Sequence, residues 1–134
     1  MKNNISLVLT VLMVLMLNSA CNTYRSISSV TKVSQLKGNP FMYQLSKAVL
    51  KNVAAYAVKI GAKGSGKVNM VTPIADVFSS EQRGGLKELM ILSYNISPKK
   101  MNGGFDKLLN FRDLIMFVGK YGKGFNFYSK NSSL

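Results

Sequence analysis

Apolar residues return every three or four positions between residues 40 and 60, which is the period of an α-helix with one buried face. The positions on this face are Met42, Leu45, Val49, Val53, Tyr56 and Ile60. The opposite face carries Gln44, Lys47, Lys51, Ala55 and Lys59. Asn39 is a residue type that suits the N-cap, and Pro40 suits the first helical position. Gly61 is expected to end the helix. The pattern predicts an amphipathic helix of about 20 residues with a cationic outer stripe.

Three further segments show helical signals. Thr72-Pro73 opens a helix of about two turns, Ser97-Pro98 opens a short helical turn that ends at residues 102–104, and Asn110 caps a final helix that residues 119–122 close. Dense apolar residues at 86–94 predict one more helix, after a break at 79–85 or a turn capped by Ser80. A short strand at 68–71 or 125–128 stays open. The expected fold class is mostly α, a small bundle of about four to five helices on an N-terminal tether.

The beginning of the chain has a different pattern. An unbroken apolar run covers Ile5 to Leu17, and Asn18-Ser19-Ala20-Cys21 follows it. The run is shorter than the roughly 18 residues that a membrane span needs, and small residues precede the cysteine. This layout is typical of a secretory signal peptide with its cleavage site.

The first 21 residues resemble the N-terminus of bacterial lipoproteins, in which a peptidase cuts before a cysteine that carries a diacylglycerol. The resemblance implies a lipid on Cys21, the chain's single cysteine. Plain secretion with cleavage after Ala20 and an uncleaved anchor are the alternatives. Asn22 replaces the aspartate that commonly retains such proteins in the inner membrane. By resemblance, we therefore expect a lipid anchor in the outer membrane, facing the periplasm.

The predicted organisation follows from these signals. Residues 1–20 form the signal peptide, 21–38 the lipidated cysteine and a flexible tether rich in Ser and Thr, 39–128 a small helical domain, and 129–134 a disordered tail. Within the tether, apolar residues at a spacing of three leave open a short helix or docking segment. Phe125, Phe127 and Tyr128 either pack back onto the helices or form an aromatic and basic patch.

Charge adds a candidate binding surface. The chain has 18 Lys and Arg against 5 Asp and Glu, a formal net charge of +13. One explanation of the cationic stripe is a helix face exposed to solvent. The alternative is contact between these lysines and an anionic lipid or polymer. The residues that would make such a contact are Lys47, Lys51, Lys59, Lys63, Lys67, Lys120 and Lys123.

Composition argues against several chemistries. Gly61 to Lys67 matches the spacing of a phosphate-binding loop, but it follows a predicted helix rather than a strand, and Val68 stands where the metal-holding Ser or Thr belongs. The chain has no histidine and few acids, so we expect no catalytic site, no metal site and no cofactor. Nucleic-acid binding fits the charge but conflicts with the export signal.

We therefore expect a lipid-anchored, non-enzymatic envelope lipoprotein, attached to the membrane through Cys21, that acts as an interaction or scaffold module with an envelope protein partner. An accessory role in a multiprotein envelope machine would fit this reading. The alternative is direct binding of an anionic envelope polymer or lipid, such as peptidoglycan, lipopolysaccharide or phospholipid, by the basic helical surface.

Overall fold

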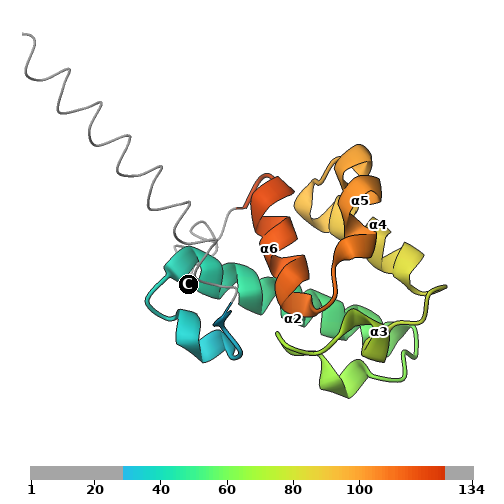
Figure 1. Cartoon of the computed structure of the whole chain (residues 1–134), viewed down its shortest axis with the longest axis horizontal. Helices are drawn as coiled ribbons and strands as arrows, with labels where there is room; N and C mark the ends of the chain where they lie inside the picture. Colours follow the sequence, from blue (N-terminus) through green and yellow to red (C-terminus); the bar gives the residue numbers. More distant parts are fainter. Residues whose placement is uncertain (1–28, 126–134) are drawn as a thin grey trace, which may run out of the picture.

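The computed structural model describes residues 29–125, and this region is mostly helical, as the sequence predicts. Its α-helices are α2 (Pro40–Lys59), α3 (Ile74–Val77), α4 (Arg83–Tyr94), α5 (Pro98–Gly104) and α6 (Phe111–Tyr121) (Figure 1). Three short 3₁₀ turns accompany them in residues 29–125: η2 (Val33–Leu36) precedes α2, η3 (Ser65–Lys67) lies between α2 and α3, and η4 (Phe105–Lys107) lies between α5 and α6. None of the helices in residues 29–125 is long and apolar enough to span a membrane.

Helix α2 has the boundaries and the buried face that the pattern predicts. The Asn39 side chain accepts a hydrogen bond from the Met42 backbone N–H, which would otherwise lack a partner in the first turn. At the other end Gly61 adopts a φ of 69°, and the N–H groups of Gly61 and Ala62 donate to the carbonyls of Val58 and Ala57. This pair of bonds is a Schellman motif, and its left-handed residue explains the glycine.

Residues 30–36, which lie within the segment predicted as a tether, pack on the domain. Val30 and Leu36 are buried, and η2 packs against α2. The reason is burial of apolar surface, because the apolar residues spaced three apart face the same way in a short turn. The docking segment that the spacing left open is therefore present at residues 30–36, and residues 21–28 lie outside the described region.

Helix α3 is shorter than the two turns predicted. Thr72 does not cap it, because the Thr72 hydroxyl donates to the Lys67 carbonyl instead, and Pro73 is the N-cap. The backbone of this region pairs with the start of α6: the N–H of Ile74 donates to the Leu109 carbonyl at 2.9 Å. An isolated antiparallel bridge joins Pro73 and Asn110, and no strand forms within residues 29–125, including 68–71.

The later helices keep their predicted caps, with one change at α4. Ser97 and Asn110 accept hydrogen bonds from the backbone N–H groups of Lys100 and Asp113, at the starts of α5 and α6. Helix α4 starts earlier than predicted, at Arg83, within the region expected to be a break. Ser79, rather than Ser80, forms the turn before it, since Ser79 and Gln82 exchange side-chain and backbone hydrogen bonds.

The core lies between α2 and α6, which cross each other in Figure 1. Three residues are fully buried there: Phe78 directly after α3, Leu86 of α4 and Phe111 of α6. Phe78 stacks on Tyr56 at 6.0 Å between ring centroids and meets Phe111 edge-on at 6.3 Å. The Phe125 ring packs against Phe41 and Tyr94, whereas Phe127 and Tyr128 lie outside the described region. Residues 29–125 thus contain a hydrophobic core of their own.

Candidate functional site

The basic face of α2 is solvent-exposed along its length. Lys47, Lys51 and Lys59 are exposed on the side of the helix opposite its buried residues. The Lys47 ammonium lies 5.0 Å from the centroid of the Tyr43 ring, one turn earlier on the helix. Lys63 and Lys67 are also exposed, in the loop that continues from α2. These five predicted residues follow one another along one helix and its following loop, and we call them the α2 basic stripe.

Lys120 and Lys123 occupy a second place, at the end of α6. Both are exposed, and Lys120 packs its ammonium 5.2 Å from the centroid of the Tyr121 ring. Lys100 of α5 approaches the same ring at 5.3 Å. The sequence analysis missed Lys100 as a member of this group, because only the packing of α5 beside α6 brings it to Tyr121. Attraction between each ammonium group and the face of the Tyr121 ring stabilises these contacts.

Few of these charges are neutralised by carboxylates. Within residues 29–125 one ion pair forms, between Lys87 and Asp106 at 3.3 Å. Asp113 is used locally, because its side chain accepts a hydrogen bond from the Leu109 N–H at the start of α6. None of the seven predicted contact lysines belongs to an ion pair in this region. Their positive charge is therefore available to an external anion.

The glycine-rich loop has a structural explanation in place of a phosphate-binding one. Gly61 ends α2, and no helix starts after Lys67, where a phosphate-binding loop would lead into one. Gly64 is buried against α3, where a Cβ atom would come within 2.8 Å of the Val77 Cα. Close packing of the loop backbone on α3 thus requires a glycine at position 64.

Among the other titratable groups of residues 29–125, the acids form no metal-binding cluster and one tyrosine has a shifted pKa. Within residues 29–125 there is no group of three His, Cys, Asp or Glu side chains that could hold a metal ion. Burial raises the pKa of the Tyr94 hydroxyl, and a hydrogen bond from the Asn52 side chain at 2.7 Å opposes this shift. A tyrosine with a raised pKa is neutral at physiological pH, so here it joins α4 to α2 as a hydrogen-bonding group.

Cys21, the predicted lipidation site, lies outside the described residues, as do the predicted signal peptide and tail. The structure therefore describes the surface of the folded region and does not test the predicted anchor. Comparison of the chain with protein-family models, with curated proteins and with solved structures finds no match.

Proposed function

We propose that this chain is a lipid-anchored, non-enzymatic protein of the bacterial envelope whose folded region contacts an anionic surface through the α2 basic stripe. The observation that carries the proposal is the row of exposed lysines on α2 and its following loop, none of them in an ion pair within residues 29–125. The anionic surface would be phospholipid headgroups, lipopolysaccharide or peptidoglycan. An outer-membrane position facing the periplasm remains part of the proposal, on the strength of the residues around Cys21.

Two attractions would hold the folded region at the membrane, the charge of the lysines and the lipid on Cys21. A lysine near an anionic membrane contributes on the order of 1 kcal/mol, so several lysines in one row are needed for measurable binding. A lipid on Cys21 would hold the folded region close to the membrane, where its effective concentration is high. A diacylglycerol has two acyl chains and would attach the chain stably by itself, so the lysines would add contact between the folded region and the surface.

The anchor is tested by metabolic labelling with a clickable fatty acid in bacteria that produce either the wild type or Cys21→Ala. We expect the wild type to be labelled and to fractionate with membranes. Cys21→Ala should lose the label and move to the soluble fraction, because the lipid on Cys21 is the proposed attachment. Unlabelled wild-type protein in the soluble fraction would contradict the anchor.

The basic stripe is tested by vesicle co-sedimentation of residues 22–134, which contain the whole described core. We expect binding to vesicles of phosphatidylglycerol and weak binding to vesicles of phosphatidylcholine. The triple variant Lys47→Gln, Lys51→Gln, Lys59→Gln should weaken binding about tenfold or more at low salt, since each lysine contributes on the order of 1 kcal/mol. Added salt should remove most of the binding.

A matched control removes the same charge from other exposed positions, with Lys37→Gln, Lys99→Gln and Lys107→Gln. We expect this triple to lose only about two- to threefold, through the long-range field. An equal loss of vesicle binding in the two triple variants would mean that net charge alone drives binding. If the wild type bound neither anionic vesicles nor peptidoglycan, the proposed role of the α2 basic stripe would be wrong.

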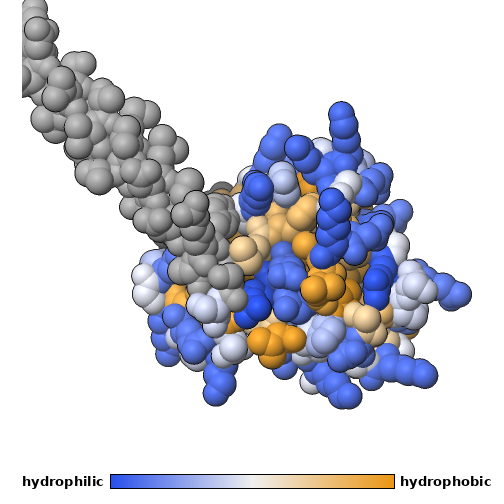
Figure 2. All heavy atoms as spheres, viewed as in Figure 1, coloured by the Kyte–Doolittle hydropathy of each residue, from blue (hydrophilic) through white to orange (hydrophobic). Residues whose placement is uncertain are grey.

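A second candidate function is docking on an envelope protein through exposed apolar residues. Hydrophobic side chains gather near the beginning of α6 in Figure 2, and Leu109, just before α6, is 74% exposed. Leu92 of α4 is 83% exposed. Such an interface would persist at high salt, because apolar contacts are not screened, so salt dependence separates the two functions.

A further inference from the structure

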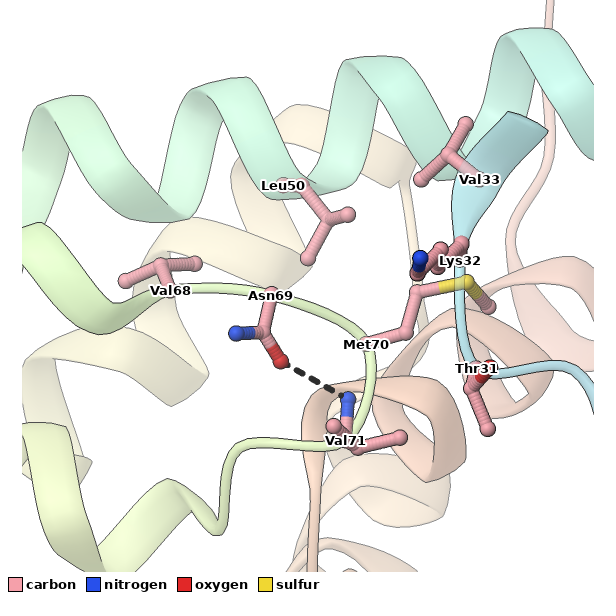
Figure 3. A pocket seen from close by; sticks show the side chains of 8 residues that line it. All are labelled: Thr31, Lys32, Val33, Leu50, Val68, Asn69, Met70 and Val71. Atoms are coloured by element: carbon pink, nitrogen blue, oxygen red, sulfur yellow. Dashed lines mark hydrogen bonds between the residues drawn. The ribbon is translucent and has the colours of Figure 1, made fainter.

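Three segments that are far apart in the sequence enclose a groove with a volume of 440 Å³ (Figure 3). One wall is formed by residues 31–33, just before and within η2, and the opposite wall by residues 68–71, after η3. Leu50 of α2 closes the side between them. The volume lies in the range of small-molecule sites in proteins, which is about 300–1,000 Å³.

The surface of the groove is mostly apolar. Val33, Leu50 and Val68 are partly buried, and Val71 is 45% exposed. The Met70 side chain is buried and lies between the two walls in Figure 3. Water against such a surface finds few hydrogen-bond partners, so an apolar ligand would displace it favourably.

The polar groups of the groove favour a negative charge at its edge. The Asn69 side-chain oxygen is already used, since it accepts hydrogen bonds from the backbone N–H groups of Val71 and Thr72, both at 3.1 Å. The Thr31 hydroxyl donates to Gln35. Lys32 is exposed and is the charged residue of the lining, and no acidic residue lines the groove. An anionic headgroup beside Lys32 would therefore meet attraction without repulsion.

Arg112 of α6 holds the two walls in place. Its backbone N–H donates to the Met70 carbonyl at 2.8 Å, and its guanidinium donates to the Val30 carbonyl at 2.9 Å. One residue thus fixes the spacing between segments that carry the opposite walls. A groove held in this way is formed before any ligand arrives, which lowers the cost of binding.

We propose that this groove binds the hydrocarbon chain of a free single-chain anionic amphiphile, a long-chain fatty acid, with the carboxylate next to the Lys32 ammonium. The apolar walls take the chain, and the open mouth leaves the carboxylate in water beside the lysine. This site is separate from the α2 basic stripe, and its occupation does not depend on surface binding by that stripe.

The test uses the purified full chain and a hexadecanoate that carries a photoactivatable diazirine in its hydrocarbon chain. After illumination, mass spectrometry of peptides locates the adducts. We expect adducts on residues 31–33, Leu50 and residues 68–71. Val71→Phe fills the groove from an exposed position and should reduce these adducts at least about fivefold, because its ring takes the space of the ligand.

Matched variants make the result specific. Val58→Phe adds the same ring at a valine that is 68% exposed on the outer side of α2, and it should leave the labelling unchanged.

Lys32→Gln should reduce labelling by the hexadecanoate about threefold, as expected for an exposed charge pair, and leave labelling by the matching diazirine hexadecanol unchanged. Lys37→Gln, an exposed lysine outside the groove, should change neither. If Val71→Phe unfolds, Val33→Phe tests the opposite wall.

Three results would overturn the proposal. Adducts confined to residues 1–28 and 126–134 would place the fatty acid elsewhere, and equal labelling of Val71→Phe and Val58→Phe would remove the groove as the site. The third result is strong labelling of Cys21→Ser and no labelling of wild-type protein recovered from membranes. It would mean that the chain's own lipid, instead of a free fatty acid, occupies the groove.

Discussion

Gly64→Ala should destabilise the folded region by about 3 kcal/mol, at the upper end of the usual cost of overpacking. The added Cβ would collide with the carbonyl oxygen of Asp76 and would come within 2.8 Å of the Val77 Cα. Both are backbone atoms of α3, so no side-chain rotation relieves the collision. The loop after α2 must move away from α3, and equilibrium unfolding in urea, followed by circular dichroism, measures the loss.

Gly66→Ala, two residues later in the same loop, is the matched control. Nothing lies within 4 Å of a Cβ at Gly66, and its φ is not in the left-handed region. The substitution should be neutral or stabilise by about 0.5 kcal/mol, through lower entropy of the unfolded chain. Gly66, and not Gly64, occupies a glycine position of the phosphate-loop spacing. Equal losses in the two variants would show that the loop needs glycines for another reason than contact with α3.

The helices with local start and stop signals could be predicted from the sequence. Asn39 and Pro40 begin α2 and Gly61 ends it, and Asn110 caps α6, because these residues act on backbone groups within a few positions of themselves. Tertiary contacts changed the elements between these two helices. Threonine is a residue type that often caps helices, but the Thr72 hydroxyl donates a hydrogen bond to the Lys67 carbonyl. Helix α3 has one turn.

The candidate site divides in the same way. The helical part of the α2 basic stripe, Lys47, Lys51 and Lys59, follows from helical periodicity, and the structure leaves these lysines exposed. Lys100 near Tyr121 and the groove beside Lys32 had no local signal. Each joins segments separated by many residues, and their approach depends on how α5 meets α6 and on how Arg112 ties residue 30 to residue 70. Periodicity reports which face is buried and not which segments meet.

Phe78→Ala should cost about 4 kcal/mol, within the range for truncation of a fully buried phenylalanine. Phe78 is fully buried, and its ring contacts Tyr56 of α2 on one side and Phe111 of α6 on the other. Truncation removes both ring contacts and leaves a cavity where α2, α3 and α6 meet. Domains of this size have a free energy of unfolding of about 5–15 kcal/mol, so Phe78→Ala would remove a large part of it.

Urea unfolding of Phe78→Ala, Phe78→Leu and Leu92→Ala separates the cavity from a general loss of hydrophobicity. Phe78→Leu keeps most of the volume and should lose clearly less than the alanine variant. Leu92 is 83% exposed, so Leu92→Ala should change stability by less than about 0.5 kcal/mol. A loss at Leu92 as large as that at Phe78 would mean that α4 buries its outer face in solution, against another copy or a partner. Under that result the exposed apolar residues, rather than the basic stripe, would become the first surface to test for function.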